Sequence, residues 1–263
     1  MNVLDQILYI PSELLVFALL LLVGGIYSTR HRQTGLQVFY LSLFSLSIAY
    51  IITLYFPFIY TNDKLVPITH PNVQLVVTVF SFFIPLARTR FQLMMCFLPP
   101  VIFCLYLLSY SSTHILSIVG GILIGGFIIY TFYRTLDWIG GMPEPYLIIS
   151  AILLPIFLAA IIFPNEQLLL YPGILLGTGL GAILEVIKVR MDERNTTFNK
   201  MVSYTIAAGG VVLFYGTEYF IGAWIPFTKI SIGIILGLWI TFVVPFLLVS
   251  FRIFRKQERS KLL

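Results

Sequence analysis

Two of the chain's 3 histidines, His70 and His114, lie in short polar motifs at the borders of apolar stretches. The motifs read THPN (69–72) and SSTH (111–114). Imidazole can attack phosphorus or transfer a proton near neutral pH, so these positions are the first candidates for chemistry. One interpretation is that the two histidines are the two ends of one headgroup pocket, provided that the fold brings the motifs together. The alternative is that both are interfacial residues wetted by lipid headgroups.

The stretches that must position these histidines are apolar helices. Hydrophobic residues make up 59% of the chain and charged residues 10%, and the mean hydropathy is +0.98, which excludes a water-soluble domain. Apolar runs of about 20 residues recur, and each can cross about 30 Å of hydrocarbon as a helix. The runs are continuous rather than alternating, which excludes a closed β-barrel. We therefore predict an all-α, polytopic transmembrane helical bundle with about nine spans. The predicted spans cover residues 8–27, 36–57, 72–87, 91–110, 115–133, 146–163, 171–188, 201–221 and 230–251.

The basic residues predict an orientation. If the helices zigzag, all of the 16 lysines and arginines except Lys64 and Lys229 fall on one side, which is typical of the cytoplasmic face. We therefore expect a plasma-membrane protein with a cytoplasmic carboxyl terminus and an amino terminus that is outside unless the first segment re-enters. THPN and SSTH then face outward. The net charge of +5 is spread over short loops, so we expect contact with anionic membrane lipids and no nucleic-acid partner.

Small residues indicate where helices pack closely. Glycines recur at helical spacing in two of the predicted spans, which lets neighbouring backbones approach each other. They are Gly120, Gly121, Gly125 and Gly126 in one span and Gly173, Gly177 and Gly181 in the other. Cys96 and Cys104 fall on one predicted helix, more than 10 Å apart at about 1.5 Å per residue, and are expected to pack as small apolar residues.

The front of the chain resembles bacterial membrane phosphatases of the type 2 phosphatidic acid phosphatase (PAP2) superfamily. The resemblance covers residues 12 to 133 and lies in helix order, loop placement and the local rhythm of the runs IYSTRHRQTGLQVFYLSLFSLSIAYIITLYFPF, PITHPNVQLVVTVFSFFIPLARTRF and LSYSSTHILSIVGGILIGG. It implies a phosphatase-like core that acts on lipid phosphates or polyprenyl pyrophosphates at the outer face of the membrane. The later helices resemble those that longer family members carry after the core.

The family's first two motifs are eroded here. The first, a lysine with an arginine-proline pair, falls at LYFPFIY (54–60), which contains no basic residue. The second, a proline-serine-glycine-histidine run, falls at THPN, where Pro71 replaces the glycine and Asn72 replaces the histidine. Gln74 matches a glutamine often found just beyond that motif, and His70 lies two residues ahead of the motif position. The cations that hold phosphate in the family are therefore missing.

The third family motif supplies the nucleophilic histidine and the aspartate that orients it. His114 matches the nucleophile, because Gly120 and Gly121 follow it much as a glycine pair follows the family histidine. No arginine lies upstream, and Ile118 occupies the aspartate position. Losing one preorganised charge-stabilising group typically lowers the rate about a hundredfold or more. The resemblance therefore implies a degenerate relative, leaning away from an enzyme, with His114 as the one weak catalytic candidate.

We accordingly expect a protein that binds, senses or transports a lipid phosphate or polyprenyl phosphate at the outer leaflet. The alternatives are an active lipid phosphate or undecaprenyl pyrophosphate phosphatase with His114 as nucleophile, a lipid flippase or transporter, and a structural subunit that binds a membrane protein partner. The expected division is a core at 1–135, a cytoplasmic linker at 136–145, further helices at 146–251 and a basic tail at 252–263. The expected ligand-binding residues are Lys64, His70, Asn72, Gln74, Ser111 and His114.

Two carboxylates fall within predicted spans, Glu185 and Glu218. Carboxylates inside a membrane are functional candidates by default. Glu185 lies close to Lys188 and Arg190, so anchoring at the inner boundary is favoured over proton coupling. Glu218 lies among aromatic residues and fits an interfacial belt. We expect no metal and no cofactor, because two histidines without a nearby carboxylate or thiolate are a poor set of metal ligands.

Overall fold

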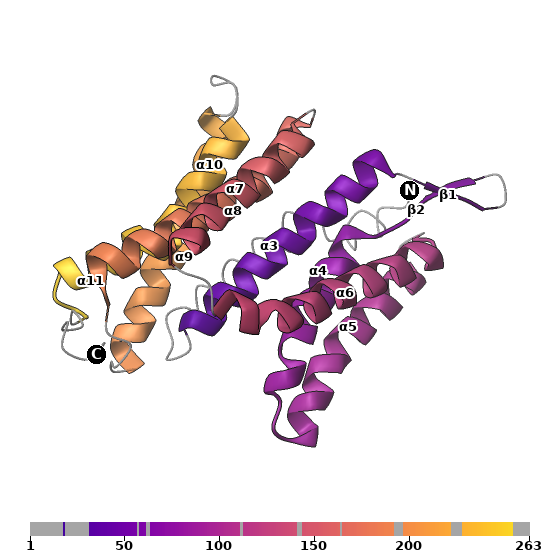
Figure 1. Cartoon of the computed structure of the whole chain (residues 1–263), viewed down its shortest axis with the longest axis horizontal. Coiled ribbons are helices and arrows are strands. Elements are labelled where there is room, and N and C mark those ends of the chain that lie inside the picture. Colours follow the sequence, from indigo (N-terminus) through magenta and orange to yellow (C-terminus); the bar gives the residue numbers. More distant parts are fainter. Residues whose placement is uncertain are drawn as a thin grey trace. The chain divides into compact units, whose positions relative to one another are not determined.

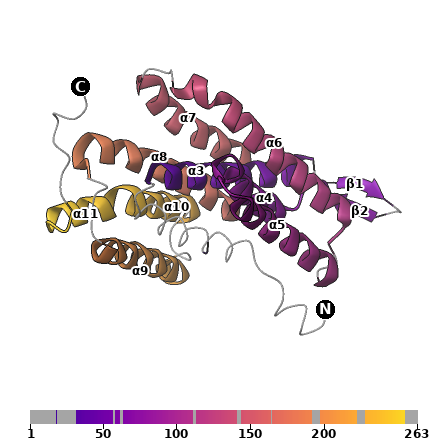
Figure 2. The same cartoon turned by 90° about the horizontal axis from the view of Figure 1, so that it is seen from below.

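The computed structural model describes residues 18, 32–56, 58–61, 64–110, 113–140, 144–163, 165–191, 197–221 and 228–254. The chain forms two compact units, which Figures 1 and 2 show together. Unit 1 contains residues 41–142, and unit 2 contains residues 18–40 and 143–263. The division after residue 142 falls inside the stretch expected as a linker. Except for Ala18, the first predicted span lies outside the described residues, as does the tail beyond Phe254.

Unit 1 is built from four helices and a small β-hairpin. The last part of α3 (Arg32–Tyr55) leads into β1 (Phe58–Thr61) and β2 (Lys64–Pro67), followed by α4 (Pro71–Phe82), the 3-10 turn η1 (Ile84–Leu86), α5 (Arg90–Tyr110) and α6 (Ile115–Gly140). Aromatic and β-branched residues, which favour strands, make up all of β1 and recur in β2. Its strands are antiparallel, with Phe58 opposite Pro67 and Thr61 opposite Lys64. The sequence analysis expected no strand here.

Unit 2 contains the later helices. They are α7 (Glu144–Ile162), α8 (Leu170–Leu184), α9 (Thr197–Ile221), α10 (Thr228–Leu238) and α11 (Val244–Ser250), with the 3-10 turn η2 (Glu166–Leu169) and the π-helical turns η3 (Glu185–Val189) and η4 (Trp239–Val243). α8 continues into η3, and α10 continues through η4 into α11. Residues 136–140 and 144–145 of the expected linker are helical, because α6 extends to Gly140 and α7 begins at Glu144.

Within the described residues, five helices are long and apolar enough to span a membrane. They match the predicted spans of α3, α5, α6, α8 and α10, and run over Gln33–Tyr55, Arg90–Ser109, Ile115–Thr135, Glu166–Val189 and Lys229–Ser250. The predicted spans at 72–87, 146–163 and 201–221 correspond to shorter apolar stretches, Pro71–Leu86, Ile148–Ile162 and Met201–Leu213. The all-α class is confirmed. The count of nine spans stays a prediction.

Glycines let α8 and α10 pack backbone against backbone, and the two helices lie side by side in Figure 1. A Cβ on Gly177 would lie 2.2 Å from the Ile234 carbonyl oxygen, and a Cβ on Gly237 would lie 2.5 Å from the Ile174 carbonyl oxygen. Both distances are far below van der Waals contact, so only glycine permits this approach. The expected close-packing role of Gly173, Gly177 and Gly181 is therefore confirmed.

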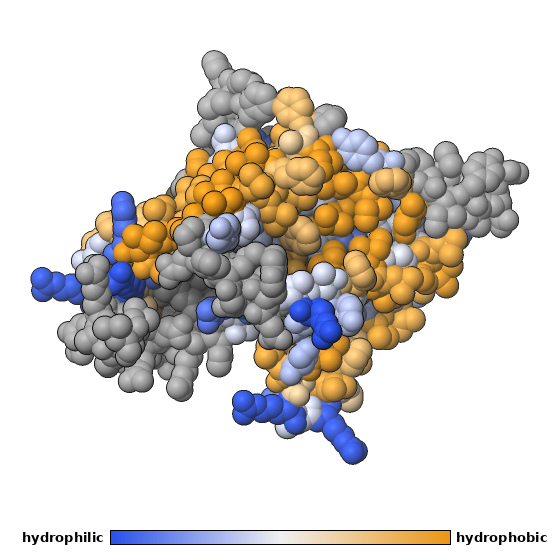
Figure 3. Space-filling view, in the orientation of Figure 1, coloured by the Kyte–Doolittle hydropathy of each residue, from blue (hydrophilic) through white to orange (hydrophobic). Residues whose placement is uncertain are grey.

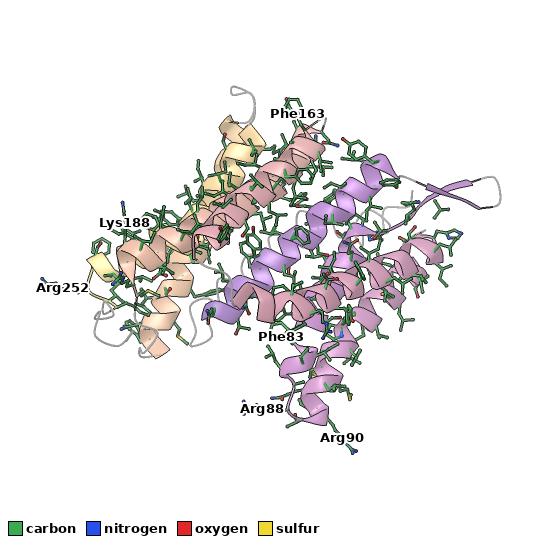
Figure 4. All side chains as sticks on the ribbon, viewed as in Figure 1. Phe83, Arg88, Arg90, Phe163, Lys188 and Arg252 are labelled. Carbon is green, nitrogen blue, oxygen red and sulfur yellow. The ribbon has the colours of Figure 1, made fainter. Side chains whose placement is uncertain are left out.

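The face of the described residues that Figure 3 shows is largely apolar, with strongly hydrophilic residues in a few separate places. Figure 4 labels Arg88 and Arg90 at the end of unit 1 opposite to the β-hairpin. In unit 2, it labels Lys188 and Arg252 at one end and Phe163 at the other. Apolar flanks with charged ends are the surface expected of helices that lie in hydrocarbon.

Candidate headgroup site at the meeting point of α4 and α6

The helices that follow the two histidine motifs, α4 and α6, are parallel. The His70 backbone N–H donates to the Ser117 carbonyl oxygen at 3.1 Å, and the Tyr133 hydroxyl donates to the Phe82 carbonyl oxygen farther along both helices. Earlier residues of α4 therefore contact earlier residues of α6, and later residues contact later ones. The antiparallel α5 connects them (Figure 1). Because α4 and α6 are parallel, their amino termini lie at the same end of unit 1.

Two glycines of α6 allow the motifs to meet. A Cβ on Gly120 would lie 1.9 Å from the Ile68 carbonyl oxygen, and a Cβ on Gly121 would lie 3.2 Å from the His70 carbonyl oxygen. The Ser117 hydroxyl donates to the Pro67 carbonyl oxygen, which ties the start of α6 to the end of β2. Gly126, in contrast, has nothing within 4 Å of a Cβ. Its expected packing role is therefore wrong, because it lies on the other side of the helix from α4.

His70 is the residue that precedes α4, in an extended conformation with φ −101° and ψ 114°. Its side chain is half-buried, and Nδ1 is buried with no hydrogen-bond partner among the residues that the structure describes. Burial lowers the pKa of His70 below its ordinary 6.5, because desolvation disfavours the imidazolium. His70 is therefore neutral at pH 7 and can contribute a dipole or a hydrogen bond, but no full positive charge.

His114 lies at the corresponding position before α6 and is exposed. Its Nδ1 accepts a hydrogen bond from the backbone N–H of Leu116 at 3.3 Å. A neutral imidazole whose Nδ1 accepts must carry its proton on Nε2. The ring therefore presents an N–H donor to the solvent side. A histidine that attacks phosphorus through Nε2 needs the opposite tautomer, with the proton on Nδ1 and a free lone pair on Nε2.

Ile118, at the position that the family resemblance assigns to the orienting aspartate, has apolar neighbours. Ile118 is buried and packs with Val73, Val77 and Leu107, where α4, α5 and α6 meet. A carboxylate at this position would be buried among aliphatic side chains without a partner, which is strongly unfavourable. The third motif therefore does not provide the second half of a phosphohistidine mechanism.

Gln74 and Asn72, two of the expected ligand residues, are buried in the interior of unit 1. The Gln74 amide nitrogen donates to the Ser45 carbonyl oxygen at 2.8 Å, and its amide oxygen accepts from the Thr69 hydroxyl at 2.9 Å. Ser45 in turn shares a 2.8 Å hydrogen bond with the Thr78 hydroxyl. Gln74 is thus the centre of a buried polar network that joins α3 to α4, and its amide is already engaged within the fold.

Two further expected ligand residues cannot be placed as side chains. Lys64 begins β2 at the same end of unit 1, but its side chain lies outside the described part, and so does Ser111 entirely. Two residues that the sequence analysis did not single out, Thr69 and Ser117, contribute to this end of the unit. The spacing of Ser117, Gly121 and Gly125, four residues apart, was the available signal for this face of α6.

The two expected carboxylates lie in unit 2. Glu185 is buried at the start of η3, and its Oε1 accepts from the Met191 backbone N–H at 3.0 Å. This bond joins the start of η3 to the chain that follows it, and the expected anchoring of Glu185 at the inner boundary stays a prediction. Glu218 lies in α9, and its side chain lies outside the described part. No group of three His, Cys, Asp or Glu among the described residues could hold a metal ion.

The fold therefore defines a helical protein with several helices fit to span a membrane, and with two histidine-preceded helix amino termini held together in unit 1. Comparison with models of known protein families, with curated proteins and with solved structures found no match for this chain.

Proposed function

We propose that the end of unit 1 where α4 and α6 begin binds the phosphate headgroup of a membrane lipid at the outer leaflet and does not hydrolyse it. The single observation that carries this proposal is the hydrogen bond from the His70 N–H to the Ser117 carbonyl oxygen, which holds two parallel helix amino termini side by side. The ligand is a lipid phosphate or polyprenyl phosphate. The resemblance to membrane phosphatases supports the same ligand class.

Helix amino termini favour anions. Each carries the equivalent of about half a positive charge. Pro71 at the start of α4 has no N–H, and the Leu116 N–H of α6 already donates to His114 Nδ1, so the remaining N–H groups of each first turn are the ones that face a ligand. Phosphate is a common ligand of such a terminus. Two termini at one end of unit 1 add their potentials, and apolar surroundings screen them less than water does. The exposed His114 ring adds an N–H donor at the amino terminus of α6.

The same geometry argues against turnover. With Nδ1 accepting from Leu116, neutral His114 has no free lone pair on Nε2 with which to attack phosphorus. The buried Ile118 leaves no carboxylate to reverse the tautomer. The lowered pKa of His70 leaves this residue without the proton that a general acid must donate near pH 7. Binding needs only the fixed dipoles and the N–H donor, so it survives these losses.

Titration of dioctanoyl phosphatidic acid into the full-length protein in phosphatidylcholine nanodiscs tests the proposal. Losing a hydrogen bond to a charged group weakens binding by about tenfold to a hundredfold, so we expect this range for His114→Ala. His114→Gln keeps a side-chain N–H donor and should bind more tightly than His114→Ala. His31→Ala is the matched control, because it removes the third histidine of the chain and should leave the Kd unchanged.

Phosphate release is measured in parallel with undecaprenyl pyrophosphate and phosphatidic acid. We expect no release above the detergent blank from the wild-type protein. Release that disappears in His114→Ala would establish the phosphatase alternative and reject a binding role without turnover. Equal Kd values for the wild type, His70→Ala and His114→Ala would reject the site itself.

A further inference from the structure

Two arginines in unit 2 adopt a backbone conformation that usually belongs to glycine. Among the described residues, Arg190 (φ 50°) and Arg252 (φ 57°) are the two non-glycine residues with positive φ, and no described glycine has a positive φ. A side chain in this left-handed region meets steric strain that glycine avoids. The chain contains 19 glycines, yet the structure places arginine at both of these positions.

Each arginine follows the end of a helix. After α11, the Arg252 N–H donates to the Val249 carbonyl oxygen at 3.0 Å, and the Ile253 N–H donates to the Leu248 carbonyl oxygen at 2.9 Å. This is the Schellman pattern, in which the left-handed position is most often glycine. After η3, the Arg190 N–H donates to the Glu185 carbonyl oxygen at 2.9 Å. The two turns end different helices by different bonding patterns.

The two turns lie beside one hydrophobic cluster. Val189 and Met191 flank Arg190, and Leu248 and Phe254 come from the Arg252 turn; all four pack in this cluster. Figure 4 labels Lys188 and Arg252 at the same end of unit 2. The Asn199 side chain donates to the Ile253 carbonyl oxygen at 2.9 Å and thereby fixes the Arg252 turn against α9.

Exposed apolar side chains accompany the cations. Val186 is 66% exposed, Ile187 57% and Phe251 70%, and Lys188 and Arg252 are exposed beside them. Apolar side chains next to lysine and arginine at helix ends are characteristic of the membrane interface, where the former enter the acyl region and the latter meet phosphate. Arginine suits this position because its planar guanidinium binds phosphate oxygens in pairs.

We propose that Lys188, Arg190 and Arg252 form a binding surface for the headgroup of an anionic phospholipid at this end of unit 2. The occupant is a lipid phosphodiester, and charge complementarity selects anionic over zwitterionic headgroups. The surface belongs to a different unit from the headgroup site of α4 and α6, so it stands whether or not that site binds lipid phosphate.

Replacement of both arginines by glycine tests lipid binding against folding, and it also removes the 3.3 Å hydrogen bond that Arg190 Nε donates to the Val186 carbonyl oxygen. Glycine adopts the left-handed conformation readily, so Arg190→Gly with Arg252→Gly should unfold in phosphatidylcholine nanodiscs at the wild-type temperature or above it. Adding 30% phosphatidylglycerol should stabilise the wild type and have little effect on the double variant. Native mass spectrometry should show phosphatidylglycerol retention about 30-fold weaker, since each of the two basic residues near a membrane surface usually contributes about fivefold.

Arg88→Gln with Arg90→Gln is the control, since it removes two positive charges from unit 1. This control should retain more phosphatidylglycerol than the double glycine variant does. The proposal is overturned if the double glycine variant retains phosphatidylglycerol at the wild-type level, or if the control loses it equally. A lower unfolding temperature of the double glycine variant in phosphatidylcholine alone would also overturn it, since the arginines would then serve the turns and not a lipid.

Discussion

Replacing Gly120 by alanine should separate the two histidine-bearing helices, and the same replacement at Gly126 should not. The added Cβ at Gly120 would lie 1.9 Å from the Ile68 carbonyl oxygen, whereas ordinary contact begins at 3.4 Å. The start of α6 must therefore move by about 1.5 Å away from the segment between β2 and α4. The Ile68 oxygen belongs to the backbone, so no side-chain rotation can relieve the overlap. Overpacking of this kind typically costs about 1–3 kcal/mol.

Alanine also stabilises a helix relative to glycine, by about 0.5–1 kcal/mol. At Gly126, nothing lies within 4 Å of the new Cβ, so only this gain remains. We thus expect Gly120→Ala to lower the free energy of unfolding by about 1–2 kcal/mol and Gly126→Ala to leave it unchanged or raise it. The difference between two variants of one helix cancels the shared propensity effect.

Unfolding of both variants in mild detergent, followed by intrinsic fluorescence during heating, measures the difference. A second readout is the Kd for dioctanoyl phosphatidic acid, which Gly120→Ala should weaken because Ile68 lies two residues before His70. Equal unfolding temperatures for the two variants would refute the packing of α6 against the Ile68 carbonyl group. If Gly120→Ala is destabilised but binds phosphatidic acid normally, the packing of α6 against Ile68 is supported and the headgroup site is rejected.

Three further predictions concern buried polar groups. Burial lowers the pKa of His70, so the unfolded chain binds a proton more readily than the folded protein does. The contribution of His70 to stability is therefore complete above about pH 6.5 and is lost as the pH falls from there through the lower folded pKa. Unfolding temperatures measured over a pH series should show that His70→Gln removes this part of the pH dependence. Gln74→Leu should lower the free energy of unfolding by about 1–3 kcal/mol, because Thr69 and Ser45 lose buried partners, while leaving the Kd of the remaining folded protein unchanged; a weakened Kd would indicate a direct ligand contact. Glu185→Gln keeps an acceptor for the Met191 N–H and should unfold within about 1 kcal/mol of the wild type, whereas Glu185→Ala should be destabilised by about 1–3 kcal/mol; equal losses in chemical denaturation would contradict the capping role.

The helices could be predicted because the apolar runs are long and uninterrupted. The predicted start of α6, residue 115, matches the structure, since the polar SSTH motif ends there. The glycines of α8 were also informative, because small residues at helical spacing have one common use in apolar helices. The hairpin of β1 and β2 was missed, because a strand pair of four residues each is too short to stand out beside spans of about 20 residues.

The candidate site was predictable only in part. The motifs themselves identify His70 and His114, but the role of Gln74 depends on Ser45, which lies 29 residues earlier in the chain. No local pattern reveals that a glutamine beside a polar motif turns inward to bond a neighbouring helix. The tautomer of His114 depends likewise on the backbone of Leu116, which only the conformation of the first turn of α6 brings into reach.

The absence of basic residues from LYFPFIY (54–60) has different consequences for binding and for hydrolysis. Two helix amino termini together supply the equivalent of about one positive charge, comparable to a single lysine, and the fold holds this charge in place. That is sufficient to attract a phosphate in its ground state. Hydrolysis needs in addition a nucleophile with a free lone pair and an acid that protonates the leaving oxygen. Backbone dipoles provide neither group. The hydrogen bond from the Leu116 N–H to His114 Nδ1 also opposes a free lone pair on Nε2. Under the proposed function, the two helix amino termini can therefore hold a phosphate without providing the means to hydrolyse it.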